Sequence, residues 1–260
     1  MRAEVAQAVV RPLADMDELA AAADVLASIW GTADGQYPLA PETLRALSHA
    51  GNYVAGAWLG EELVAVSAGF IGLHDGKPHL HSHISGVARA HQGTHIGFDL
   101  KQHQREWALA HGIDVIEWTF DPLVRRNAYF NLTKLGAVVV EFEPDFYGDM
   151  QDEINAGDHT DRAVARWLLN GPARPPVDSA GAPAILRPND DGTPVADGSS
   201  APVLRAWIPE DHAAMRESDP AVATAWRLAV RDTFGAAIRG GYVATAMTRD
   251  GWYTLVKETS

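Results

Sequence analysis

Histidines recur at every second position in one short stretch of this chain. His79, His81 and His83 are followed at the same spacing by Ser85, and side chains two residues apart share one face of a β-strand. An imidazole has a reference pKa of ~6.5, so it can accept a proton from an attacking amine at neutral pH. The stretch therefore predicts a general base on a strand, with His81 and His83 as the candidates.

Two other interpretations of these histidines stay open. His81 and His83 could chelate one metal ion, with His79 or Asp121 completing the site, or the imidazoles could face solvent on a half-buried strand. No strict metal-ligand motif accompanies them, so we expect no metal. The chain has no cysteine, which excludes disulfides, cysteine-ligated zinc and thiol nucleophiles.

A single acid stands at the end of a neighbouring predicted strand. Asp121 follows the apolar run 115–120 and precedes Pro122. Its carboxylate could orient a histidine or bind the ammonium group of an acceptor. Asp–Pro also commonly starts a helix, where the Asp side chain caps the first turn. The sequence leaves both roles open.

A loop with two glycines follows the histidine stretch. Residues 92–97 read Gln-Gly-Thr-His-Ile-Gly and connect the predicted strand 79–87 to a predicted helix over 98–111. The free amides at a helix N-terminus and the helix dipole favour a bound phosphate. The loop therefore predicts an anion site, and its alternative is a β-turn that only connects the two elements.

The elements that carry these residues alternate in type along the first half of the chain. Hydrophobic periodicity and the positions of Gly, Pro and Asp predict the order β-α-α-β-β-β-α-β-α-β. The predicted strands are 9–13, 53–59, 63–71, 79–87, 115–120 and 138–142, and the predicted helices are 16–30, 41–47, 98–111 and 125–135. The strand, helix and strand from 79 to 120 form one right-handed crossover.

The composition changes after residue 170. A helical pattern over 158–169 gives way to 171–201, where Pro, Gly, Asp and Ser dominate, and apolar periodicity returns over 202–260. We expect a domain over 1–170, a linker or long surface loop over 171–201, and a small C-terminal α+β unit over 202–260. About 60 residues are marginal for independent folding, so this unit should pack on the first domain or on a dimer partner.

The element order and two motifs of this chain resemble the GNAT superfamily of N-acetyltransferases. Gln92 and Gly97 match the ends of the family's pyrophosphate loop, Gln/Arg-x-x-Gly-x-Gly/Ala, with His95 at the position of the middle glycine. The stretch 127–137, which contains Ala128 and Lys-Leu-Gly, resembles the second family signature. The resemblance spans about residues 8–148 and extends to an uncharacterised subgroup of predicted acetyltransferases. It implies an α+β fold with a central mixed, mostly antiparallel sheet flanked by helices.

The resemblance also implies a cofactor site. Residues in three segments would hold acetyl-CoA: the loop would bind the pyrophosphate, the fourth strand would offer a backbone amide to the thioester carbonyl, and the later helix would lie beside the pantetheine. These residues are Gln92, Gly93, Thr94, His95, Ile96 and Gly97 in the loop, Ser85, Gly86 and Val87 in the strand, and Asn127 and Asn131 in the helix.

The resemblance implies the chemistry as well. A GNAT enzyme transfers an acyl group by direct attack of an amine, and we expect that group to be acetyl here. His81 stands where several members carry the base. The family's tyrosine acid falls on Leu132, so Tyr129, one turn earlier, is the candidate acid. Its alternative is a tyrosine packed between helix and sheet. Two other functions remain open: binding of acyl-CoA or another ligand without transfer, and a metal-dependent activity on the face of His79, His81 and His83.

The charge of the chain restricts its partners. The formal net charge is −13, from 21 Lys and Arg against 34 Asp and Glu, so the chain lacks the basic surface that nucleic acids and anionic membranes attract. Residues 1–7 show no signal-peptide pattern, and no apolar run approaches ~20 residues. We expect a cytoplasmic bacterial protein that binds a small-molecule amine, binds neither nucleic acid nor membrane, and could form a homodimer.

Overall fold

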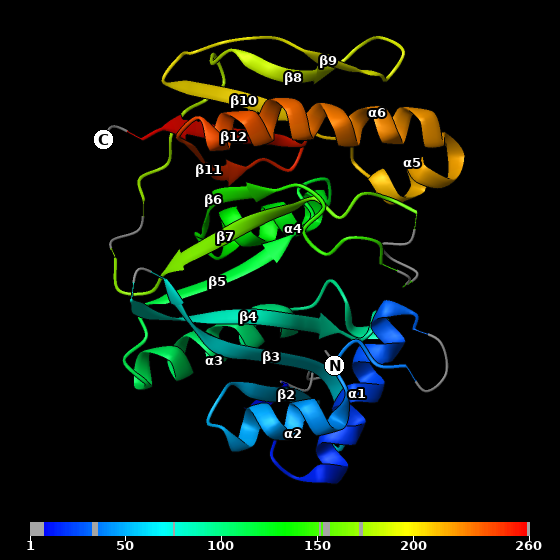
Figure 1. Cartoon of the computed structure of the whole chain (residues 1–260), viewed down its shortest axis with the longest axis vertical. Coiled ribbons are helices and arrows are strands. Elements are labelled where there is room, and N and C mark those ends of the chain that lie inside the picture. The colour runs from blue at the N-terminus through cyan, green and yellow to red at the C-terminus, as the bar shows by residue number, and fades with distance from the viewer. Residues whose placement is uncertain are drawn as a thin grey trace, which may run out of the picture. The chain divides into compact units, whose positions relative to one another are not determined.

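The computed structural model describes residues 8–32, 36–74, 76–150, 152, 157–171 and 174–258. Two compact units divide the chain: the first contains residues 1–117 and 151–154, and the second contains 118–150 and 155–260 (Figure 1). These bounds differ from those expected from composition. The stretch 1–7, in which no signal-peptide pattern was found, lies outside the described residues.

The helices of the first unit lie where the periodicity predicted them. Asp15 caps α1 by accepting a hydrogen bond from the Asp17 amide at 2.9 Å, and Gly31, with a φ of 62°, ends it in the left-handed conformation that glycine favours. A proline at the first position starts α2, because its missing N–H would have no partner there. These helices are α1 (Met16–Trp30), α2 (Pro41–His49) and α3 (Ile96–Ala110).

The sheet of the first unit is mixed and mostly antiparallel. Its strands are β1 (Val9–Pro12), β2 (Val54–Leu59), β3 (Glu62–His74), β4 (Lys77–Val87) and the first half of β5 (Val115–Phe120), adjacent in this order. Neighbours from β1 to β4 are antiparallel. The β4–β5 pair is parallel, with Leu80 opposite Ile116, as the predicted crossover requires.

Helices cover both faces of this sheet. On one face, α1 and α2 bury Leu19, Leu26 and Leu44 against sheet residues that include Val66 and Ile84. On the other face, α3 packs through Ile96 and Leu100. Each face of the sheet therefore has its own apolar layer, and β4 runs between the two.

Over its described residues, the second unit continues the chain with seven further strands. They are β6 (Val138–Glu143), β7 (Arg162–Leu168), β8 (Ala184–Pro188), β9 (Pro194–Ala196), β10 (Val203–Trp207), β11 (Tyr242–Met247) and β12 (Trp252–Lys257), in the spatial order β7-β6-β11-β12-β10-β8-β9. Its helices are α4 (Arg125–Ala128), α5 (His212–Ser218), α6 (Pro220–Val230) and α7 (Ala236–Arg239), with π-helical turns at Tyr129–Lys134 and Arg231–Gly235.

Two local predictions in this half are wrong. The stretch 158–169 was predicted to be a helix, but residues 162–168 form β7, which pairs antiparallel with β6. Its buried side chains Ala163, Ala165 and Trp167 alternate, and alanine and arginine favour helices in isolation, so pairing with β6 overrides the local preference. The segment 171–201 is not only a linker or loop, because β8 and β9 lie in it and β8 pairs with β10.

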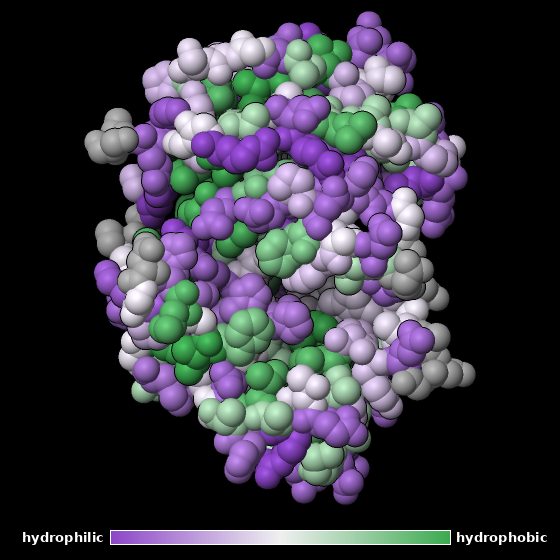
Figure 2. All heavy atoms as spheres, viewed as in Figure 1, coloured by the Kyte–Doolittle hydropathy of each residue, from purple (hydrophilic) through white to green (hydrophobic). Residues whose placement is uncertain are grey.

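The side chains in the view of Figure 2 are mixed in character, with hydrophilic and hydrophobic groups interspersed. Large exposed apolar side chains include Phe70, Ile71 and Leu73 on β3. Among the residues that the structure describes, no helix combines the length and the apolar character needed to cross a membrane.

Candidate functional site

The predicted histidines lie together on β4, beside an aromatic residue of β3. Phe70 stands opposite His81 in the antiparallel pair, and the two rings stack with centroids 4.9 Å apart and planes at 29°. The His83 ring lies 5.8 Å from Phe70 and 6.2 Å from His81. The structure therefore brings both candidate bases together with the partly exposed Phe70 ring.

The alternation of β4 breaks between Ser82 and Ser85. Both serines bond toward α3: Ser82 accepts from Lys101 at 2.8 Å, and Ser85 lies 2.7 Å from Ser67, which accepts from Gln104 at 3.2 Å. Side chains three positions apart point to opposite faces of a regular strand, so a β-bulge reverses the alternation here, where the pairing with β3 also shifts. The expectation that Ser85 shares the face of the histidines is wrong for this reason.

Burial weakens the histidines as bases. The pKa of His81 falls to about 4, first because burial disfavours the imidazolium and then because the neighbouring His83 and His79 add positive charge. Burial also lowers the pKa of His83. Both imidazoles are therefore neutral at pH 7 and free to accept a proton, but the His81 imidazolium is a stronger acid than ordinary imidazolium.

Glu117 is a site residue that the sequence reasoning missed. It lies on β5, opposite His81 in the parallel pair, and is 8% exposed. Its Oε2 stands 3.6 Å from His79 Nε2. An acid inside the apolar run 115–120 was the available signal, because carboxylates are seldom buried without a functional or paired role.

The loop after β4 has the geometry of an anion site. Residues 89–91 form a 3₁₀ turn, and α3 begins at Ile96 with His95 before it. Within the described residues, the amides of Gly93, Thr94, His95 and Gly97 donate to no protein acceptor. The loop is exposed, and the Gln92 side chain donates to the Val87 carbonyl at 3.1 Å, which ties the loop to the end of β4.

Two positions in this region favour glycine for different physical reasons, one for its backbone conformation and one for lack of space. Gly93 has a φ of 80°, a backbone conformation that residues with a Cβ rarely adopt. Gly86 on β4 has no room for a Cβ, which would lie 2.7 Å from Ile29 and 2.9 Å from Trp30 of α1. The end of α1 therefore closes against the strand segment that was predicted to hold the thioester. Gly97 has space, since its Cβ would meet only Val87, at 3.6 Å.

A second group that the sequence reasoning missed is polar and buried under α3. Lys101 is 6% exposed and Gln104 is fully buried, and the two side chains are 3.0 Å apart. Burial lowers the pKa of Lys101 to about 7. The signal was in the sequence: both residues fall on the apolar face of the helix, with Leu100 and Ala108.

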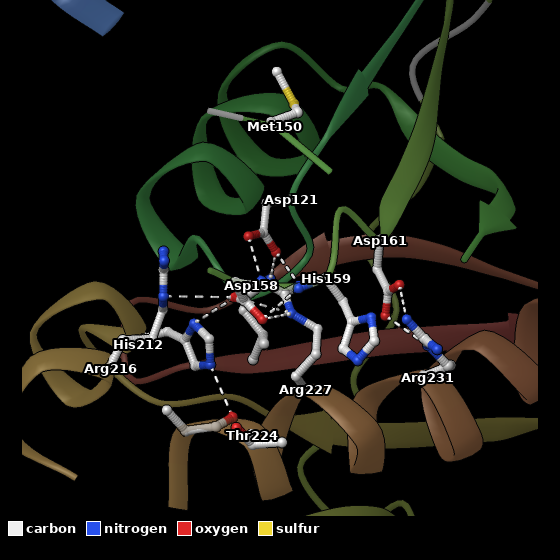
Figure 3. Close-up of polar contacts among 12 residues, drawn as sticks. Asp121, Met150, Asp158, His159, Asp161, His212, Arg216, Thr224, Arg227 and Arg231 are labelled. Carbon is white, nitrogen blue, oxygen red and sulfur yellow. Dashed lines mark hydrogen bonds and ion pairs between the residues drawn. The ribbon is translucent and has the colours of Figure 1, made fainter. Parts of the chain in front are cut away.

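Asp121 lies in the second unit, in an ion-pair network with α6. Arg227 donates to both of its oxygens, at 2.8 and 2.7 Å, and also bonds to Asp158 at 2.7 Å (Figure 3). Asp121 Oδ1 accepts from the Leu123 amide at 2.8 Å. Burial would raise the pKa of Asp121, but the hydrogen bonds and charge of Arg227 outweigh burial and lower it. Asp121 therefore bonds within the turn that precedes α4 and does not cap a helix, because α4 begins at Arg125 with Val124 as its N-cap and no side-chain cap bond. Its catalytic role stays a prediction.

The remaining predicted residues also lie in the second unit. Tyr129 accepts a hydrogen bond from Arg249 at 3.4 Å, and this bond holds the pKa of the phenol below its ordinary value. Leu132, at the position of the family acid, is 3% exposed. Asn131 is buried and its carbonyl accepts from the Ala137 amide, whereas Asn127 is exposed. Their roles at a cofactor stay predictions.

No group of three or more His, Asp or Glu side chains among the described residues is placed to hold a metal ion. This applies to the histidines of β4 as well: His81 and His83 lie against the Phe70 ring, and His79 lies 3.6 Å from Glu117.

Comparison with known proteins relates part of this chain to a protein family. Residues 19–136 match the model of the acetyltransferase (GNAT) family. This chain contains a GNAT domain. The match covers α1 through the π-helical turn of the second unit, and so includes the histidine strand, the loop 92–97 and the second motif. The GNAT family supports acyl transfer as the general class of reaction, and the predicted α+β fold is confirmed.

Solved structures similar to the GNAT domain have low sequence identity to it. The ribosomal-protein-S18-alanine N-acetyltransferase from Escherichia coli is 11% identical, with 66% of this chain and 100% of that chain covered and a TM-score of 0.50. A putative acetyltransferase from Salmonella typhimurium, yncA with acetyl-CoA, is 17% identical over 66% and 99%, with a TM-score of 0.49. A GNAT acetyltransferase from Streptococcus pneumoniae is 15% identical over 62% and 99%, also at 0.49. The first likeness shows a shared fold. None of the curated proteins matches this chain.

Proposed function

We propose that this protein transfers an acetyl group from acetyl-CoA to the amine of a small molecule. The observation that carries the proposal is the loop 92–97, whose outward amides stand at the start of α3 directly after β4. A pyrophosphate is the anion that such a helix N-terminus suits. The match of residues 19–136 to the GNAT family supports acetyl-CoA as its source.

In this proposal, residues of the first unit would supply the parts that direct aminolysis needs. Backbone amides near Gly86 and Val87 would polarise the thioester carbonyl, and His81 or His83 would take the amine proton directly or through a water molecule. The stacked Phe70 fixes the His81 ring. Glu117, opposite His81 in the parallel pair, would attract a cationic amine toward the imidazoles.

Tyr129 is the proposed proton donor to the leaving thiolate. Its pKa lies below the ordinary phenol value because Arg249 donates to the hydroxyl, and a lower pKa makes a better donor at neutral pH. In the family the acid stands where this chain has the buried Leu132. That replacement favours a second candidate function, in which the domain binds acyl-CoA without transferring the acyl group.

Calorimetric titration with acetyl-CoA and with free CoA tests the cofactor site. We expect micromolar binding that weakens at least tenfold in Gly97→Leu, whereas Gly97→Ala folds normally because its Cβ meets only Val87 at 3.6 Å. Gly93→Ala, which strains a φ of 80° inside the loop, should also weaken binding, and Gly112→Ala, at the far end of α3 with a φ of 70°, is its matched control for backbone strain away from the loop. Absence of binding of both ligands to the unaltered protein would refute the proposal.

Acceptor screening then separates the two candidate functions. Release of free CoA in the presence of a panel of small amines supports transfer, and His81→Ala or His83→Ala should lower kcat about 100-fold or more, according to which residue is the base. Binding of acetyl-CoA without release of CoA for any amine favours the second candidate. Size-exclusion chromatography with light scattering tests the proposed homodimer.

A further inference from the structure

A chain of hydrogen bonds runs from the buried Lys101 to the surface of β4. Lys101 Nζ donates to Gln104 Oε1 at 3.0 Å, and Gln104 Nε2 donates to Ser67 Oγ at 3.2 Å. Ser67 Oγ lies 2.7 Å from Ser85 Oγ. The first three side chains are at most 6% exposed, but Ser85 is exposed. The chain therefore connects a cation under α3 with a surface hydroxyl.

The donors in this chain have one consistent direction. A protonated Lys101 only donates, so the carbonyl oxygen of Gln104 must face it and the amide nitrogen must face Ser67. Ser67 thus accepts from Gln104 and needs an acceptor for its own proton, because buried hydroxyls rarely leave a donor unused. Its other hydrogen-bond partner is Ser85. Ser67 then donates to Ser85, whose own proton is left for a group outside the protein.

Ser85 stands where a bound thioester would lie. It directly precedes Gly86 and Val87, and the Val87 carbonyl accepts from Gln92 of the anion loop. The β-bulge turns Ser85 toward the α3 face instead of the histidine face. Without the bulge, the Ser85 side chain would point away from Ser67 and the chain of hydrogen bonds could not form.

We propose that the Ser85 hydroxyl donates a hydrogen bond to bound acetyl-CoA, and that Gln104 is the positioning residue that sets its direction through Ser67. This inference rests on the proposed function. Chains of aligned hydrogen bonds polarise one another in a low-dielectric interior, so the cation at Lys101 strengthens Ser85 as a donor. Ser85 would thus bind acetyl-CoA together with the backbone amides of β4.

Replacing Gln104 by Glu tests the direction of the hydrogen bonds from Lys101 to Ser85 while keeping a side chain of nearly the same size. The carboxylate accepts from Lys101 and from Ser67, so Ser67 must then accept from Ser85, and Ser85 loses its outward proton. Ser85→Ala removes the same proton directly. Ser85→Thr keeps a hydroxyl, and Ser48→Ala is the matched control, because Ser48 gives a single hydrogen bond to the Leu13 carbonyl in the same unit.

Affinities for acetyl-CoA and for free CoA are measured by calorimetry at pH 6.5, where Lys101, with a pKa of about 7, is mostly protonated. We expect Ser85→Ala and Gln104→Glu each to weaken acetyl-CoA binding about 3- to 10-fold, the value of one hydrogen bond. The double variant should lose no more than either single one. Ser85→Thr and Ser48→Ala should bind like the unaltered protein, and thermal unfolding confirms that every variant is folded.

The outcomes separate this inference from the proposed function. Loss of affinity for acetyl-CoA alone supports a bond to the acetyl carbonyl, and equal loss for CoA supports a bond to the pantetheine arm. Unaltered affinity in Ser85→Ala, or losses that add in the double variant, overturns the inference and leaves the acetyl-CoA site intact. Failure of the unaltered protein to bind either ligand overturns both.

Discussion

Arg227 should be among the most costly side chains to remove from the second unit. It is 1% exposed and makes close hydrogen bonds to two carboxylates, those of Asp121 and Asp158, whose side chains are 21% and 12% exposed. In Arg227→Met these carboxylates keep their negative charge but lose the cation that bonds to both, and Asp158 keeps its longer ion pair with Arg216, at 3.9 Å. Removing one partner of a buried ion pair costs about 3–5 kcal/mol. We expect about 3 kcal/mol, because the carboxylates retain some contact with water.

Urea denaturation at pH 7, followed by tryptophan fluorescence, measures this loss. With a denaturant slope of about 2–3 kcal/mol/M, the midpoint should fall by about 1 M or more. Arg187→Met is the matched control, because its pair with Asp197 is 46% and 51% exposed and such pairs contribute about 0–1 kcal/mol. The double variant Arg227→Met with Asp121→Asn should be more stable than Arg227→Met, since the uncompensated charge at position 121 is gone.

Lowering the pH should reduce the difference in unfolding free energy between Arg227→Met and the unaltered protein. The net pKa of Asp121 is lowered in the folded protein, so its ion pair stabilises above the unfolded pKa and that stabilisation is lost as pH falls through the folded value. In the variant, the Leu123 amide and the charge of Arg162 still oppose the effect of burial on the Asp121 pKa, but Arg227 no longer does. Asp121 therefore takes up its proton at higher pH than in the unaltered protein, which relieves the penalty. An Arg227→Met protein as stable as Arg187→Met at pH 7 would refute this account of the network.

Three further expectations follow from single contacts. Lys101 has a pKa of about 7 in the folded protein, against the ordinary 10.5, so the unfolded chain holds this proton to higher pH. The unfolding free energy of the unaltered protein should therefore rise relative to that of Lys101→Met by about 2 kcal/mol from pH 7 to 9. Parallel pH profiles of the two proteins would contradict this. Gly69→Ala places a Cβ 2.6 Å from the His81 carbonyl, at the bulge, and should lower the unfolding free energy by about 1–3 kcal/mol in urea titrations, with Gly97→Ala unaffected. Tyr129→Phe should lower kcat about 100-fold with unchanged acetyl-CoA affinity, and full activity would remove Tyr129 as the acid.

The elements of the first unit follow from local rules that the sequence displays. Asp15 and Gly31 set the limits of α1, and alternating apolar residues set the strands, because caps, turns and periodicity act over a few residues. The loop 92–97 is also local, since a glycine turn before a helix creates its own outward amides. The GNAT fold was therefore predictable, and so was the position of the loop that we propose as its anion site.

The sequence failed where a distant partner decides the conformation. Residues 162–168 favour a helix by composition but form β7, because β6 offers backbone hydrogen bonds that no local window contains. The strands in 171–201 likewise exist through pairing of β8 with β10 and β9. Asp121 was read as a catalytic or capping residue, and its pairing with Arg227 spans 106 positions of the chain.

The sequence by itself determined the residue types of the site, which are a row of histidines on one strand, a glycine loop before a helix, and a lysine and a glutamine on that helix. The burial of the last two was seen only in the structure. Only the tertiary structure decided which way each points. One bulge in β4 separates Ser85 from His81 and His83 and joins it to Lys101 through two intermediates. A bulge arises from the pairing of two strands and not from either alone, so no periodicity along β4 could have shown it.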